Sequence, residues 1–204
     1  MLQTRTVEPG TLELLKNLMS LPELDGFYLV GGTALALQFG HRMSVDLDLF
    51  TELQFDKVAL LEALQKSYDV LVETEEGSML ITSINFVKVV FVKMSYPVLF
   101  DPIVAEGVRM LEIRDIAPMK LKAVTQRGSK KDFYDIYYLL DYLTIQQMLE
   151  LFSLKFRQFE IFHVLKSLNY FDDAEKYPDP VLFDKTVTWN KVKSKIQSTV
   201  KSHL

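Results

Sequence analysis

Short apolar runs alternate with glycine and turn residues through the first half of the chain, a pattern typical of mixed α/β structure. Apolar residues at helical spacing predict helices over residues 11–21, 33–39 and 55–68. Apolar and alternating runs predict strands over residues 27–30, 45–50, 70–73, 79–83 and 86–94. Successive side chains of a strand point to opposite faces, so we expect Val45, Leu47 and Leu49 to face the core.

The second half of the chain is predicted to be almost entirely helical. Asp115 is a candidate cap for a helix over residues 116–127, with Pro118 tolerated in the first turn. Ser129 and Thr144 are candidate caps for the next two helices, the first of which spans residues 130–143. Further helices are predicted over residues 159–168 and 189–200, on either side of an acidic loop. We therefore predict an α/β lobe over residues 1–110, a helical lobe over residues 111–204, and an active cleft between them.

Composition narrows the class of protein. The chain has 204 residues, of which 49% are hydrophobic, so it can form a core without covalent cross-links. It contains no cysteine, which excludes disulfides and cysteine-bound zinc, and its three histidines show no metal-ligand spacing. No run approaches the roughly 20 apolar residues that span a bilayer, and the N-terminus lacks a signal-peptide pattern. We therefore expect a cytoplasmic protein with no membrane partner.

Charge is distributed unevenly along the chain. The net charge is −4, yet residues 185–204 hold five lysines and no acidic residue. A basic tail on an acidic body is typical of a nucleic-acid contact, and it equally describes a solvated helix face.

Two glycines separate the strand predicted over residues 27–30 from the next helix. Gly31 and Gly32 permit backbone angles that are closed to other residues and let a ligand approach the main chain. Thr33 then opens a helix, whose N-terminal N–H groups favour a phosphate, and its hydroxyl is a further candidate donor. These three residues are candidate nucleotide-binding residues.

A carboxylate pair follows in the next strand. Asp46 and Asp48 are two residues apart, so both side chains should project from one face, about 6–7 Å apart. Two like charges so close repel unless a cation neutralises them, and Mg²⁺ binds one or two carboxylates together with nucleotide phosphates. An alternating strand of this kind alone also describes an ordinary exposed strand face. The compact sequence of strand, glycine turn, helix and carboxylate strand favours a metal–nucleotide site.

This combination resembles the motif of polymerase-β-like nucleotidyltransferases, in which Gly-Gly or Gly-Ser precedes a short helix and Asp-x-Asp. The segments that begin at Val30 (Val-Gly-Gly-Thr-Ala-Leu) and at Arg42 (Arg-Met-Ser-Val-Asp-Leu-Asp-Leu-Phe) are more narrowly similar to the AbiEii/AbiGii family of toxins from type IV toxin–antitoxin systems. The resemblance extends to about residue 142. It implies an α/β nucleotidyltransferase fold, an NTP substrate, Mg²⁺ as cofactor and a separate cognate antitoxin.

A second group of charged residues lies on the helices after residue 115. Lys120 and Arg127 are seven apart and share a helix face, as do Asp132 and Asp135, which are three apart. Two cations near a carboxylate pair would suit a triphosphate. The ordinary alternative is that Asp132 offsets a helix dipole and Lys131 pairs with Asp135 on the helix surface.

The resemblance favours a functional role for this second group. AbiEii-like proteins carry a lysine in such a helix and then a Lys-Asp-x-x-Asp helix start, which Lys120, Lys131, Asp132 and Asp135 match. It implies catalytic roles for Lys120, Asp132 and Asp135, alongside Asp46 and Asp48. Arg127 and Lys131 are further candidate nucleotide-binding residues.

One position departs from the family pattern. Polymerase-β-like enzymes take a third carboxylate from a neighbouring strand, and the matching position here is Val90. Asp132 or Asp135 would then replace that acid, one metal ion would suffice, or the chain would bind nucleotide without turning it over.

The expected function is Mg²⁺-dependent transfer of a nucleotidyl group from an NTP to an acceptor hydroxyl, with tRNA as a candidate acceptor. Gly32 and Thr33 would hold phosphates, Asp46 and Asp48 the metal, and Lys120 the triphosphate. The alternative is a catalytically impaired nucleotide-binding or interaction protein on the same fold. A structural module that uses the apolar stripe of the C-terminal helix as an interface is a third possibility.

Overall fold

The computed structural model describes residues 1–203, and the chain divides into two compact units. The first unit contains Met1–Gly40 and Ser44–Leu111, and the second contains His41–Met43 and the chain from Glu112 onward. The three-residue segment His41–Met43 thus belongs by its contacts to the second unit, although both its sequence neighbours belong to the first.

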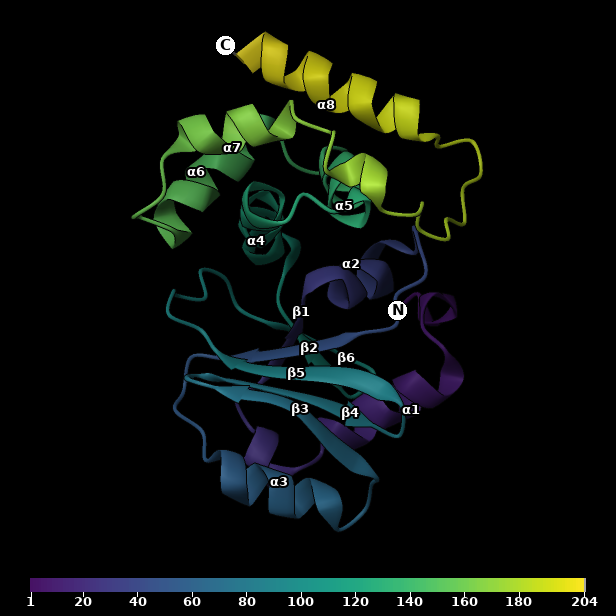
Figure 1. Cartoon of the computed structure of the whole chain (residues 1–204), viewed down its shortest axis with the longest axis vertical. Helices are drawn as coiled ribbons and strands as arrows, with labels where there is room; N and C mark the ends of the chain where they lie inside the picture. The colour runs from purple at the N-terminus through teal and green to yellow at the C-terminus, as the bar shows by residue number, and fades with distance from the viewer. Residues whose placement is uncertain (204) are drawn as a thin grey trace. The chain divides into compact units, whose positions relative to one another are not determined.

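A mixed seven-stranded sheet forms the centre of the first unit, in the order β3-β4-β5-β2-β1-β7-β6 (Figure 1). β2 runs antiparallel to β1 and parallel to β5. The strands are β1 (Tyr28–Val30), β2 (Leu47–Thr51), β3 (Val70–Glu76), β4 (Met79–Ile84), β5 (Val87–Lys93), β6 (Ile103–Ala105) and β7 (Val108–Met110).

Three α-helices belong to the first unit: α1 (Pro9–Leu18), α2 (Gly31–Phe39) and α3 (Lys57–Gln65). α2 and α3 lie on opposite sides of the sheet (Figure 1). One face of the central strands is fully buried and carries apolar side chains such as Leu47, Leu49 and Phe91. The opposite face is only half-buried at Asp48, Phe50 and Val90, and this is the face that carries polar chemistry.

The alternating pattern placed Leu47 and Leu49 correctly, but Val45 is 59% exposed and precedes the strand. In α3, Leu60 and Leu64 form the buried side, and Val58 is exposed. The pattern also missed β6 and β7, which have three residues each and so show no period, and whose sequences lack the four-residue apolar run that marked β1.

Five α-helices belong to the described part of the second unit: α4 (Ile113–Gln126), α5 (Lys130–Leu139), α6 (Ile145–Lys155), α7 (Ile161–Leu168) and α8 (Trp189–His203). Thr144 caps α6 through a capping box with Gln147, as its position predicts. Val192, Ile196 and Val200 form the buried stripe of α8.

The cap assigned to α4 was wrong. α4 begins three residues earlier, at Ile113, and Glu112 caps it. Pro118 therefore lies in the second turn, and Asp115 is fully buried and paired with Lys155 at 2.5 Å. Ser129 does occupy the position before α5, but its hydroxyl donates to the Asp132 carboxylate at 2.6 Å rather than capping the backbone.

No helix between residues 1 and 203 is both long enough and apolar enough to cross a membrane.

Candidate active site

The N-terminal turn of α2 is shaped by Gly31. This residue has φ +69°, a left-handed conformation that favours glycine. A Cβ atom at this position would lie 2.6 Å from Asp48 Oδ2, so only glycine admits the carboxylate this close. The residue before the helix is Val30, whose side chain cannot cap it. The positive end of α2 therefore faces a carboxylate across a bare glycine backbone.

Thr33 ties the same turn to the second aspartate. Its hydroxyl donates to the carbonyl oxygen of Asp46, and the Ser44 hydroxyl lies 2.8 Å from it. Thr33 is buried, so the hydroxyl that was a candidate phosphate donor instead fixes the start of the carboxylate strand. The first turn of α2 thus contacts both residues of the Asp-x-Asp pair.

The sheet register places Val90 directly beside Asp48. β2 and β5 are parallel, and Asp48 pairs with Val90, while Val30 is its partner on the other side. Paired residues in adjacent strands point to the same face. A carboxylate at position 90 would therefore adjoin Asp48, and this chain has an isopropyl group there.

Two carboxylates beside a helix N-terminus suit one magnesium ion. Among residues 1–203, no group of three acidic or histidine side chains forms a metal cluster. Mg²⁺ does not require one, because it commonly binds one or two carboxylates and completes its shell with water and substrate phosphate oxygens. Asp46 and Asp48 are both half-buried, which leaves their side chains partly accessible. The donor set therefore fits Mg²⁺ bound together with a phosphate.

The second unit contains a separate, fully buried carboxylate pair. Asp132 accepts hydrogen bonds from Lys120 Nζ at 3.0 Å, from Arg127 Nε at 2.8 Å and from the Ser129 hydroxyl. Lys120 also lies 2.7 Å from Asp135 Oδ2, so one ammonium group links the two carboxylates. Both aspartates have no exposed side-chain surface.

Asp135 is held by two further residues from a distant part of the sequence. Arg42 donates to both of its oxygens, Nε to Oδ1 at 2.7 Å and Nη2 to Oδ2 at 2.8 Å. His41 Nε2 lies 2.8 Å from Oδ1. We call Asp132, Asp135, Lys120, Arg42, Arg127 and His41 the ionic cluster.

Charges within the ionic cluster set its protonation states. Burial would raise the pKa of Asp135, but Arg42 and Lys120 outweigh it and hold that pKa well below its usual value. Asp132 behaves alike: burial opposes ionisation, and Lys120 and Arg127 lower its pKa. Burial alone would lower the pKa of Lys120, yet the two carboxylates raise it. Burial lowers the pKa of His41 below 6.5 despite its contact with Asp135.

These shifts bear on the roles expected for Asp132 and Asp135. A proton acceptor works best with a pKa near the working pH and within reach of its substrate. Both carboxylates are instead buried, strongly acidic and engaged by cations. Their geometry suits fixing the chain around them rather than taking a proton from an acceptor hydroxyl.

The ionic cluster confirms that Lys120 and Arg127 converge, since both contact Asp132, and that Asp132 and Asp135 share a face, since both contact Lys120. Lys131 is exposed. His41 and Arg42 were missed as site residues. The available signal was two adjacent basic residues inside the motif itself, but their partner lies 93 residues beyond Arg42 in the sequence.

The basic tail is largely engaged within the second unit. Lys193 pairs with Glu175 at 2.9 Å, and Lys195 pairs with Asp141 at 2.5 Å. Lys191 donates to the carbonyl of Thr186. These contacts favour the interpretation of a solvated helix face over a nucleic-acid contact.

Comparison with known families decides the identity of this motif. The family model of the nucleotidyl transferase AbiEii toxin, from type IV toxin–antitoxin systems, matches residues 13–202. The chain belongs to the AbiEii nucleotidyltransferase toxin family. An uncharacterised protein of Aquifex aeolicus is 34% identical to this AbiEii-family chain over 206 residues, which cover 98% of each protein.

Solved structures of low sequence identity show the same fold. JHP933 from Helicobacter pylori is 19% identical, with a TM-score of 0.52 over 96% of this chain and 94% of the other. The antibiotic-resistance factor ANT(2'')-Ia is 15% identical, with a TM-score of 0.50 over 70% of this chain and 90% of its own. The α/β nucleotidyltransferase fold expected from the motif is therefore confirmed.

Proposed function

We propose that this AbiEii-family chain transfers a nucleotidyl group from an NTP to an acceptor hydroxyl with the help of Mg²⁺. The observation that carries the proposal is the meeting of the first turn of α2 with both aspartates, through Gly31 against Asp48 and Thr33 bound to Asp46. A helix N-terminus suits a phosphate and a carboxylate pair suits Mg²⁺, so their proximity supports a site that binds both with one substrate.

In this proposal the backbone N–H groups of Gly32 and Thr33 orient the phosphates at the positive end of α2. Asp46 and Asp48 would hold Mg²⁺. When bound, the ion neutralises charge on the phosphates and polarises the group being transferred. Gly31 keeps the backbone bare so that the phosphates and the Asp48 carboxylate approach each other closely.

The ionic cluster has a positioning role in this proposal. His41–Met43 leads within three residues to Asp46, and Asp135 holds its two basic side chains. The same segment forms backbone hydrogen bonds with residues 181–183, from Met43 to Val181 and from Phe183 to His41. Lys120, Asp132 and Arg127 complete the charge balance around Asp135. Lys131, which is exposed, remains a candidate phosphate contact.

The direct test incubates purified protein with Mg²⁺, each labelled NTP in turn and total tRNA, beside the Asp46→Ala/Asp48→Ala variant. Label transfer that disappears in the variant supports the proposal and identifies the nucleotide. Transfer that persists in the variant rejects the metal assignment. Growth arrest on induced expression, relieved by the same double substitution and by co-expression of a neighbouring antitoxin gene, tests the toxin role.

Val90 favours a second candidate function, nucleotide binding without turnover. The register puts this apolar side chain where a third carboxylate would adjoin Asp48. Mg²⁺-dependent NTP binding without transfer to any acceptor would support this second candidate over the first.

A further inference from the structure

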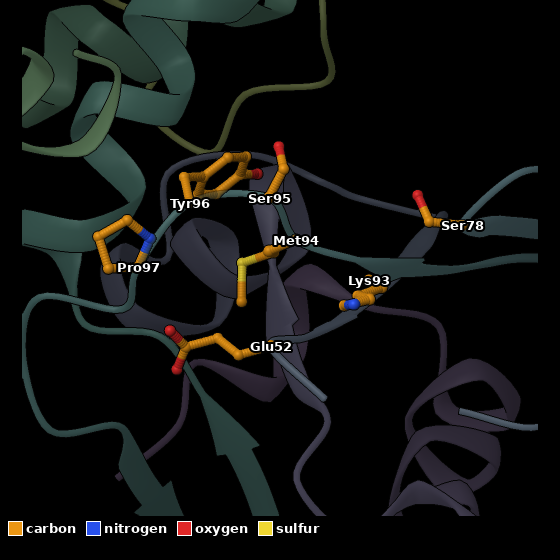
Figure 2. Close-up of a pocket in the computed structure, with 7 residues that line it drawn as sticks. All are labelled: Glu52, Ser78, Lys93, Met94, Ser95, Tyr96 and Pro97. Atoms are coloured by element: carbon orange, nitrogen blue, oxygen red, sulfur yellow. The ribbon is translucent and has the colours of Figure 1, made fainter. Parts of the chain in front are cut away.

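The first unit contains an open hollow of ≈ 510 Å³ to which the sequence assigns no role. It lies where β2 and β5 end, and Figure 2 shows the side chains that line it. Glu52 follows the last residue of β2, Lys93 is the last residue of β5, and Met94, Tyr96 and Pro97 come from the segment after it.

The position of the hollow relates it to the carboxylates. β2 and β5 are parallel neighbours and end side by side, with Thr51 opposite Lys93. Glu52 and Asp48 are four residues apart on an extended chain, about 13 Å, which is within the length of one nucleotide with its phosphates.

Glu52 connects the hollow with Asp48 more directly. Alternate residues of a strand share a face, so Asp48, Phe50 and then Glu52, just after the end of β2, follow the same side of the strand. Glu52 and Tyr96 both line the hollow, so an occupant of the hollow would lie beside the half-buried sheet face that carries Asp48.

The lining combines planar apolar surface with both signs of charge. Tyr96, Met94 and Pro97 offer an aromatic ring, a thioether and a proline ring, and Lys93 and Glu52 add a cation and an anion. The charged ends are already held in place: Lys93 Nζ donates to Gln54 Oε1 at 3.1 Å, and Glu52 Oε1 accepts from the Val98 N–H at 3.0 Å. Bases stack on aromatic rings, whereas ribose and base edges need hydrogen-bonding groups.

We propose that this hollow is a nucleoside subsite of the proposed nucleotidyltransferase. The base lies against Tyr96 and Met94, Glu52 accepts hydrogen bonds from ribose hydroxyls or a base amino group, and Lys93 attracts a phosphate or base oxygen. The volume lies within the roughly 300–1,000 Å³ typical of small-molecule sites. The nucleoside belongs either to the donor NTP or to the end of an RNA acceptor, and both present the same chemistry.

The test measures binding of AMP, GMP, CMP and UMP to the full chain by saturation-transfer NMR and calorimetry, without Mg²⁺. We expect at least one of them to bind. Tyr96→Leu and Lys93→Ala should each weaken that binding at least about fivefold, the range for loss of one stacked base or one charged contact. Tyr96→Phe keeps the ring and should bind like wild type, as should the matched control Lys66→Ala, which changes an exposed lysine of the same unit.

In the binding experiment, two results overturn the subsite: no mononucleotide binds the wild-type chain, or Tyr96→Leu and Lys93→Ala bind as wild type does. Lys93→Ala alters a half-exposed side chain, so its result stands even if Tyr96→Leu fails to fold.

The source of the nucleoside follows from a second pair of measurements. A weaker NTP affinity of the two variants in Mg²⁺ assigns the hollow to the donor, whereas a raised KM for RNA at unchanged NTP affinity assigns it to the acceptor. The subsite rests on the proposed function, but different results reject the subsite and the function. Mononucleotide binding without any transfer rejects the function alone, and transfer that is unchanged in both variants rejects the subsite alone.

Discussion

Each unit carries a pair of closely spaced aspartates, and the two pairs have opposite surroundings. Asp46 and Asp48 are half-buried beside the N-terminus of α2. Asp132 and Asp135 are fully buried among Lys120, Arg42 and Arg127. A carboxylate pair that has its own cations is complete and stabilises the fold. A pair that stays half-buried beside a helix N-terminus can take a metal ion and a phosphate from solution, so the two pairs predict opposite responses to neutralisation.

Neutralising Asp135 should have the largest effect of the changes considered, and that effect is a loss of stability. Asp135→Asn leaves the buried Arg42 without the carboxylate that it binds at both oxygens and Lys120 with only one of its two, which costs about 3–5 kcal/mol in the free energy of unfolding. Denaturant unfolding followed by circular dichroism measures it. The matched control is Asp141→Asn, which breaks the exposed pair with Lys195 and should cost under about 1 kcal/mol. Equal losses in the two variants would contradict a special role for the ionic cluster.

Neutralising Asp48 should instead remove activity and spare the fold. Asp48→Asn keeps the shape beside Gly31 but weakens metal binding, so we expect transfer to fall by about a hundredfold or more. The free energy of unfolding should change much less than in Asp135→Asn, because Asp48 is only half-buried. Asp101→Asn, at an exposed site of the same unit, is the control for both measurements. A destabilised Asp48→Asn would mean that this pair, too, is structural.

Adding a carboxylate beside Asp48 should strengthen metal binding at this pair. Val90→Asp places a third acid next to the pair, because the register sets position 90 opposite Asp48. We expect Mg²⁺ to bind about tenfold more tightly, measured by calorimetry, since affinity rises with the number of charged ligands. Val92→Asp is the matched control, on the same strand face but opposite Phe50. A similar gain in both variants would show a general charge effect and no defined site.

The smallest expected effect is a pH dependence that originates in the ionic cluster. The pKa of His41 is lower in the folded chain than the 6.5 of the free side chain. As the pH falls, His41 therefore takes up a proton in the unfolded chain before it does so in the folded chain. The contribution of neutral His41 to stability is complete above pH 6.5 and declines as the pH falls toward the folded pKa.

The slope of the free energy of unfolding against pH that is due to His41 should reach at most about 1.4 kcal/mol per pH unit. Unfolding of wild type and His41→Gln between pH 7.5 and 5 isolates it, because glutamine keeps a donor but does not titrate. His163→Gln replaces an exposed histidine of the same unit and should leave the slope unchanged. If His41→Gln showed the wild-type slope, another group would be responsible.

Local features of this protein follow from its sequence alone. Gly31 with its positive φ, the short helix after it and the alternation of Leu47, Asp48 and Leu49 depend on neighbours within a few residues. Backbone sterics and strand periodicity act at that range, and together they are specific enough to indicate a nucleotidyltransferase motif.

Which charges meet, and which side chains adjoin the carboxylates, depends on how distant parts of the chain pack together. Arg42 and Asp135 are 93 residues apart, and nothing local to either indicates that they pair. The neighbour of Asp48 depends on the register between β2 and β5, which a shift of one residue would change entirely. The hollow beside Tyr96 likewise needs three separate chain segments to meet. Pairings of this kind depend on the packing of the whole unit, because burial, rather than sequence spacing, selects the partner of a buried charge.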